Sequence, residues 1–211
     1  MKASINLQIH PNPGIISKMT LSLAHWAPLS WYAAALREEV LTLEAFEHYQ
    51  KGSLRNRCYI AGPGGPQRLS IPLESGKHQQ KPVRDVLLAG HGDWQRNHWR
   101  SIRTAYGNAP YFEHFADEIV VFYEKKYTHL FDYNLEILNW TLHRIFRWKG
   151  KIELTTDWQG PEGQWAVADN PAAAISPGPA YPQVFSDRFG FLPNLSVLDA
   201  IFCCGKNITL E

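Results

Sequence analysis

The sequence lacks the charge excess that marks two large classes of protein. Its 211 residues carry 21 Lys and Arg against 20 Asp and Glu, so the formal net charge is only +1. That balance argues against a nucleic-acid binder that relies on bulk positive charge, and against an acidic disordered chain. Charged residues make up 19% of the chain, below the roughly 25% of an average globular protein. The length suits one domain with a sizeable core.

Cysteine is also scarce. Cys58, Cys203 and Cys204 are an odd number of thiols without CxxC spacing, which excludes a disulfide framework and a zinc ribbon. A bridge between the adjacent Cys203 and Cys204 would be strained. Cys58 follows two arginines, but it falls inside an expected strand, so we interpret it as a buried structural thiol. We therefore expect free thiols and a reducing compartment, the cytoplasm.

The motifs that bind metals and common cofactors are missing. The nine histidines are scattered, with neither HxH nor HExxH spacing. GxGxxG and GxSxG are absent as well, which argues against a dinucleotide fingerprint and an α/β-hydrolase. The glycine-rich run at 62–67 lacks the Lys-Ser/Thr of a P-loop and precedes an expected strand, so we interpret it as a hairpin turn rather than a phosphate loop. We predict no metal and no cofactor.

No apolar run is long enough to cross a membrane. The longest candidate, residues 19–36, is interrupted by His25 and Pro28 and follows eighteen other residues. It fits neither a signal peptide nor a transmembrane helix, which needs about 20 mostly apolar residues. We predict interior structure of a soluble protein without a membrane span.

Aromatic residues, in contrast, are abundant. They form 13% of the chain, with 8 Trp, 9 Tyr and 10 Phe. This excess needs a location, either in the core, in a binding site or on an interface with a partner.

Hydrophobic periodicity predicts an α/β fold. A strand, a helix and a second strand open the chain and favour a parallel pairing, and Asp132 and Asn194 are the expected caps of two later helices. The expected strands are 20–25, 40–45, 57–61, 68–73, 83–88 and 151–156, and the expected helices are 31–37, 93–106, 111–126, 132–147 and 195–202.

These elements predict one domain, residues 19–211, with a mixed, mostly parallel sheet, a β-hairpin and flanking helices. Residues 1–18 contain two prolines and little periodicity, so we expect a flexible N-terminal arm. Residues 159–182 carry five of the 14 prolines and no clear period, which indicates a Pro/Gly-rich loop.

The densest group of polar residues follows the second expected strand, where ligands bind in open α/β sheets. Arginine and lysine side chains there suit a carboxylate or a phosphate, and an asparagine and a tyrosine stand between them. A solvated basic loop is the alternative. The candidate substrate-binding residues are Tyr49, Lys51, Arg55, Asn56 and Arg57.

A second group lies on the helix expected at 93–106. Trp94, His98 and Tyr106 recur at helical spacing and share one face. His98 is either a core histidine or, at a cleft, a general base, since the ordinary histidine pKa of about 6.5 suits that role. His25, at the end of the first expected strand, is a second candidate base or a packed loop histidine.

Several segments together resemble motifs of the WbqC-like family. They are AHWAPLSWY at 24–32, HYQKGSLRNR at 48–57, LSIPL at 69–73, WQRNHW at 94–99, AY at 105–106, APYF at 109–112 and LSVLD at 195–199. The resemblance extends from about residue 20 to residue 205. His25-Trp26 replaces the more usual proline and tyrosine, and residues 159–182 lack the glycine-rich stretch of longer members, so the chain resembles a short form.

The resemblance implies a bacterial protein from the surface-polysaccharide gene clusters that gave the family its name, and a transfer of groups onto sugars. We therefore expect a transferase that acts on a nucleotide-linked or phosphorylated sugar, or on a similar small anionic substrate. Lys51, Arg55 and Arg57 would hold the anion and Asn56 would orient it. His25 or His98 would be the general base, and Trp94, Tyr106 and Tyr49 would form a stacking wall.

Two other functions are open. The chain could be a non-enzymatic binding or scaffold protein whose aromatic residues form an interface. Binding of single-stranded nucleic acid by stacked aromatics lacks the required basic surplus, so we predict no nucleic-acid partner. The oligomeric state does not follow from the sequence.

Overall fold

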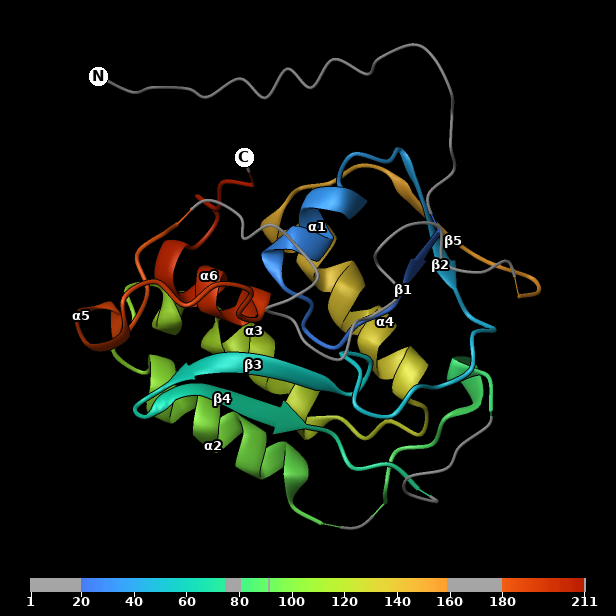
Figure 1. Ribbon diagram of the computed structural model, residues 1–211, viewed down its shortest axis with the longest axis horizontal. Coiled ribbons are helices and arrows are strands. Elements are labelled where there is room, and N and C mark those ends of the chain that lie inside the picture. The colour runs from blue at the N-terminus through green and yellow to red at the C-terminus, as the bar shows by residue number, and fades with distance from the viewer. Residues whose placement is uncertain (1–19, 75–80, 91, 159–179, 211) are drawn as a thin grey trace.

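The computed structural model describes residues 20–74, 81–90, 92–158 and 180–210 (Figure 1). The arm predicted at 1–18 and most of the loop predicted at 159–182 lie outside the described residues.

Three parallel strands form one sheet of the fold. Its order is β1 (Thr20–Ser22), β2 (Val40–Glu44) and β5 (Lys151–Leu154). Parallel neighbours need a crossover, and α1 (Leu29–Ala35) supplies it between β1 and β2. All of β1, and β2 from its second residue on, are buried, as expected for strands covered on both faces. The predicted strand–helix–strand opening is confirmed.

An antiparallel hairpin forms separately from this sheet. It pairs β3 (Arg57–Gly62) with β4 (Gly65–Ser70), so the turn is only Pro63-Gly64. The second strand starts three residues earlier than the Arg68 we predicted. Gly65 has a φ of +104°, which glycine adopts without strain, so the chain can reverse within this short turn.

The helices cover the hairpin from two sides. In Figure 1 the hairpin crosses the molecule with α2 (Trp94–Tyr106) on one side and α6 (Val197–Cys204) on the other, while α4 (Leu130–Trp140) lies between hairpin and sheet. α3 (Phe112–Glu124) packs against α2 and α6, and α5 (Ser186–Phe189) is a short turn of helix before α6. The predicted α/β class, with a mostly parallel sheet, a hairpin and flanking helices, is confirmed.

The strand predicted at 83–88 is wrong. Val83–Asp85 is a 3₁₀ turn (η1), because the amide of Asp85 donates to the carbonyl of Pro82. The residues after it make isolated bridges only, Leu73 with Leu88 and Leu87 with His129. The alternating side chains therefore pack against separate segments instead of entering a ladder.

The start of α4 also differs from the prediction. The helix begins at Leu130 with His129 in the capping position, so Asp132 lies in the first turn and is not the cap. Its carboxylate is 3.5 Å from Nδ1 of His129. The long helix predicted to 147 ends at Trp140 and continues as a π-helical turn (η2, Thr141–Ile145).

α6 is capped by a different residue from the one we predicted. The hydroxyl of Ser196 accepts a hydrogen bond of 3.2 Å from the amide of Leu198, whereas Asn194 lies two residues earlier with a φ of 57°. Serine at this position satisfies a helix-end amide. The predicted stop at Gly205 is confirmed, with a φ of 64°.

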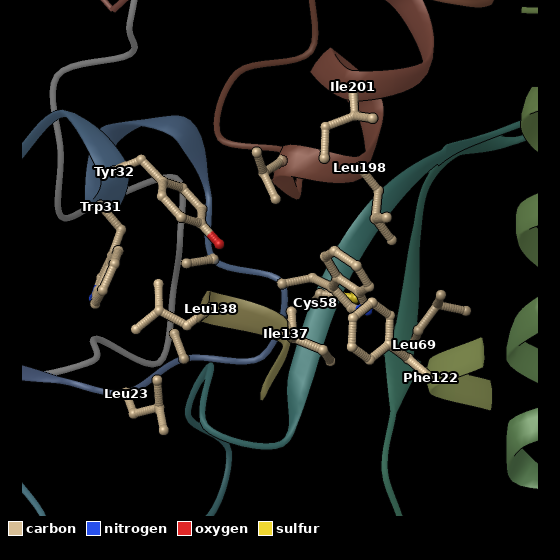
Figure 2. Packing of buried hydrophobic residues seen from close by; sticks show 14 of the residues in the cluster. Leu23, Trp31, Tyr32, Cys58, Leu69, Phe122, Ile137, Leu138, Leu198 and Ile201 are labelled. Carbon is tan, nitrogen blue, oxygen red and sulfur yellow. The ribbon is translucent and has the colours of Figure 1, made fainter. Parts of the chain in front are cut away.

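The aromatic excess is located mainly in the core. The described large hydrophobic side chains that are exposed are Val121, Leu154 and Trp158. Figure 2 shows how the hairpin, α1, α4 and α6 contribute to one buried cluster; its labelled members include Trp31, Tyr32, Cys58, Leu69, Ile137, Leu138, Leu198 and Ile201.

Leu198 tests whether α6 closes this core. Its side chain is fully buried between α6 and the hairpin. We expect Leu198→Ala to lower the free energy of unfolding by about 2–5 kcal/mol, because truncation loses apolar burial and leaves a cavity. Urea denaturation measures this. Leu154→Ala, at a side chain that is 45% exposed, is the control and should change little.

Candidate functional site

His25 lies three residues beyond the carboxyl end of β1, where the backbone makes a sharp turn. Its amide donates a 2.8 Å hydrogen bond to the carbonyl of Leu54, which joins the turn to the loop after β2. The next residue, Trp26, has a φ of 42° and is fully buried. A bulky residue in the left-handed region is strained, and such strain persists only where the surrounding structure enforces it. The turn therefore holds the His25 side chain in a fixed position.

The hydrogen bonds of Asn134 determine which nitrogen of His25 carries the proton. The amide nitrogen of Asn134 donates 2.7 Å to the carbonyl of Arg55, so its Oδ1 is free to accept. Nδ1 of His25 lies 3.2 Å from that oxygen and must be the donor, because an amide oxygen cannot donate. The other ring nitrogen, Nε2, then carries a lone pair; it is buried and has no hydrogen-bond partner among the described residues.

His98 is arranged in the same way. It lies on the first half of α2, and its Nε2 is 3.1 Å from the backbone carbonyl of Ser70 at the end of β4. A carbonyl only accepts, so Nε2 carries the proton and Nδ1 carries the lone pair. Within the ranges that the structure describes, Nδ1 is also buried without a partner. Two histidines from distant parts of the chain thus each present one bare acceptor nitrogen.

The two rings lie together in an aromatic group that we name the histidine cluster: His25, His98, Trp94, Tyr123 and Tyr133. The centroids of the two imidazoles are 6.3 Å apart. Tyr133 lies 5.5 Å from His25, and Trp94 lies 5.2 Å from His98 and 5.7 Å from Tyr133. Tyr123 lies 6.3 Å from His98. Among the five, only Trp94 is half-buried; the others are buried.

Burial keeps both histidines neutral at pH 7. It lowers the pKa of His25 well below the ordinary 6.5, and the neighbouring His98 adds to that shift, against a smaller opposing effect of the Asn134 bond. Burial lowers the pKa of His98 to about 4. It raises the pKa of Tyr123 and of Tyr133. Each of these two hydroxyls interacts with the other, and this contact affects the pKa of both.

Arg55, a predicted anion-binding residue, has its charge offset by a buried carboxylate. Its guanidinium forms a bidentate ion pair with Glu47, in which Nε lies 2.7 Å from Oε1. Both side chains are 2% exposed. The hydroxyl of Ser22 donates 2.7 Å to the same carboxylate, which ties the pair to β1. The Nη1 atom of Arg55 is buried and has no hydrogen-bond partner in the described part of the chain.

The remaining residues of the predicted anion loop lie beside this pair. The hydroxyl of Tyr49 donates 3.0 Å to Oδ1 of Asn56, whose Nδ2 donates 2.9 Å to the carbonyl of Ile71. Arg57 is half-buried and donates to the carbonyl of Gly52 at 3.0 Å, while no described residue is a partner of its Nε. Lys51 is exposed.

Tyr106 belongs to a different group of residues. Its hydroxyl accepts from the amide of Ala61 at 2.9 Å and donates to Asp199 at 2.8 Å. Gln183 donates to the same carboxylate at 2.9 Å. Tyr106 lies twelve residues beyond Trp94, about 18 Å along the axis of α2. The structure therefore brings together His25, His98, Trp94 and the loop after β2, but not Tyr106.

The sequence interpretation missed four polar residues of the site: Glu47, Tyr123, Tyr133 and Asn134. For one of them the sequence held a signal. Asn134 follows Leu130 and precedes Leu138 at helical spacing, so an amide interrupts an apolar stripe. A buried amide needs partners, and these are His25 and the Arg55 backbone.

The described residues contain neither a cluster of metal ligands nor a membrane-spanning helix. Within them, no group of three or more His, Cys, Asp or Glu side chains is placed to hold a metal ion. Nor does any described helix have the length and apolar character needed to cross a bilayer. The three cysteines are free thiols, as predicted.

Comparison with known families shows to which family the chain belongs. Residues 29–175 match the WbqC-like protein family, which is more than half of the chain. The chain belongs to the WbqC-like family. The resemblance inferred from the motifs is thereby confirmed.

One curated relative is an uncharacterized protein, Rv1507c, from Mycobacterium tuberculosis. It is 34% identical over 93 residues, which cover 43% of this chain and 39% of that protein. The match thus spans well under half of the relative's length. No solved structure matches the chain.

The neutral histidines predict a pH-dependent stability. Because the folded-state pKa values lie below the 6.5 of an unfolded histidine, the unfolded chain binds more protons in acid. The stabilising contribution is complete above pH 6.5 and is lost as the pH falls toward 4. We expect His98→Gln to flatten the slope of unfolding free energy against pH by about 1.4 kcal/mol per unit in this range.

Urea denaturation at pH 7, 6, 5 and 4.5 measures that slope. His114→Gln, at an exposed histidine on α3, is the matched control and should keep the wild-type slope. A wild-type slope in His98→Gln would contradict the buried neutral state.

The ion pair makes a separate prediction. Arg55→Ala leaves the carboxylate of Glu47 buried without its partner, so we expect a loss of about 3–5 kcal/mol in unfolding free energy. Arg37→Ala, at an exposed arginine after α1, should stay within about 0.5 kcal/mol of wild type. Equal stability of the two variants would show that the pair is not structural.

Proposed function

We propose that the protein is a transferase that moves a group onto a small sugar-like acceptor in bacterial cell-surface polysaccharide biosynthesis. The observation that carries this proposal is the pair of buried, neutral imidazoles, each with one bare acceptor nitrogen. Membership of the WbqC-like family supports it. His25 and His98 are the candidate bases.

A transferase needs a base that is unprotonated at neutral pH and shielded from water. Both conditions hold here, because the low pKa values keep the rings neutral and the burial keeps competing water away. The second ring nitrogen of each histidine is occupied by a fixed acceptor, which orients the ring as catalytic histidines require. The half-buried Trp94 supplies an aromatic surface at the edge of the cluster.

The loop after β2 supplies the candidate anion site. This loop adjoins His25 directly. The backbone carbonyl of Leu54 accepts a hydrogen bond from the His25 amide, and the backbone carbonyl of Arg55 accepts one from Asn134, which also binds the His25 ring. We propose that Lys51 and Arg57 hold the phosphate of a nucleotide-linked or phosphorylated sugar. Arg55, neutralised by its carboxylate, would contribute only its unpartnered Nη1 atom.

The scaffold alternative has less support. An aromatic interface needs exposed rings, and in the described residues Trp26 and Trp31 are buried while Trp158 is exposed. Trp148 is half-buried, and Trp165 lies outside the described residues. The free thiols favour a cytoplasmic site of action for the enzyme we propose.

Removal of the two cationic side chains tests the anion site. We expect Lys51→Ala/Arg57→Ala to weaken binding of UDP-glucose, GDP-mannose or dTDP-glucose at least tenfold, because each charge-assisted hydrogen bond is worth about 1.5–3 kcal/mol. Isothermal titration calorimetry measures the dissociation constants at fixed salt.

The matched control is Arg37→Ala/Lys149→Ala, which removes the same charges from exposed positions elsewhere. It should bind as wild type does. Binding that is unchanged in Lys51→Ala/Arg57→Ala, or absent in the wild type for all three sugars, would overturn the proposed anion site.

A further inference from the structure

We propose that the histidine cluster is a subsite for a primary amine, so that the acceptor of the transfer is an amino sugar. This inference deepens the function proposed above and rests on it for the role of the amine as acceptor. It starts from the two bare nitrogens, Nε2 of His25 and Nδ1 of His98, whose tautomers are set by Asn134 and Ser70.

The hydrogen-bonding capacity of the two rings selects the ligand. Both bare nitrogens can only accept, so their ligand must donate twice. A hydroxyl has one proton to donate and satisfies one ring. A neutral primary amine has two N–H donors and keeps its lone pair free. Of the common sugar substituents, the amine therefore satisfies both histidines and still offers a nucleophile.

The spacing of the rings fits one shared donor group. A hydrogen bond from nitrogen is about 2.9 Å long, and the two N–H bonds of an amine diverge at about the tetrahedral angle. One amine nitrogen bonded to both rings then places the ring centroids about 6.5 Å apart. The observed separation is 6.3 Å.

The charges around the cluster also favour an uncharged donor. Asn134 binds the backbone carbonyl of Arg55, and the side chain of Arg55 is paired with Glu47, so that pair is neutral as a unit. A carboxylate or phosphate would face the two imidazole lone pairs, which repel it. Buried polar atoms without partners are rare in proteins, and the two bare ring nitrogens of this cluster, on His25 and His98, are accounted for if a polar ligand belongs there.

Ring-nitrogen NMR tests the subsite directly. The full-length protein, labelled with ¹⁵N in its histidines, is titrated at pH 8 with glucosamine, glucose and N-acetylglucosamine. At this pH a large share of an amine with a pKa of about 8 is neutral. We expect glucosamine to shift the resonances of Nε2 of His25 and Nδ1 of His98, and to bind at least tenfold more tightly than the other two sugars.

Two variants separate the subsite from general effects. His98→Phe keeps an aromatic ring but removes the acceptor nitrogen, so it should lower glucosamine affinity at least tenfold, whereas His114→Phe should leave it unchanged. Should His98→Phe fail to fold, the wild-type nitrogen shifts still decide the matter. Equal affinity for glucosamine and glucose, including no binding of either, together with unshifted ring nitrogens, would overturn the amine subsite.

The failure of this inference is distinguishable from failure of the proposed anion site. Nucleotide-sugar binding that depends on Lys51 and Arg57, without any preference for the amine, overturns the amine subsite alone. A preference for the amine, with nucleotide-sugar binding that is insensitive to Lys51→Ala/Arg57→Ala, overturns the anion site alone.

Discussion

The side-chain amide of Asn134 is the interaction on which the site depends. It donates to the Arg55 backbone at 2.7 Å and accepts from His25 at 3.2 Å, so one residue of α4 joins the turn after β1 to the loop after β2. The contact with Arg55 joins residues that are 79 positions apart in the sequence, and the contact with His25 joins residues that are 109 positions apart. With His98 anchored to the end of β4, they bring four separate elements to one place. The orientation of His25 follows from this amide rather than from its own loop.

Desolvation explains the chemistry of the histidines better than nearby charge does. The largest effect on the pKa of each ring is burial, and no carboxylate in the described part of the chain is hydrogen-bonded to either. In many enzymes a histidine is paired with a carboxylate that stabilises its cationic form. Neutral partners, an amide and a carbonyl, leave these two rings as uncharged acceptors. The cluster is thus built to receive hydrogen bonds from a ligand.

The fold was largely predictable because its signals are local. The strand–helix–strand opening and the helical stripe of α2 follow from periodicity, and Gly65 determines the hairpin turn. The strand expected at 83–88 was wrong. Alternating apolar and polar residues indicate that every second side chain is buried, but they do not show that the segment pairs with a neighbouring strand. The convergence of His25 and His98 was not predictable, since it depends on contacts between distant segments. For the same reason nothing local showed that Glu47 would offset the charge of Arg55.

The central claim is that His25 and His98 are neutral, with fixed and opposite tautomers. Long-range ¹H–¹⁵N correlation NMR at pH 7 reports the protonation state of each ring nitrogen. The account predicts a protonated Nδ1 and a bare Nε2 in His25, and a protonated Nε2 and a bare Nδ1 in His98. A cationic ring, or the reversed tautomer in either histidine, would contradict it.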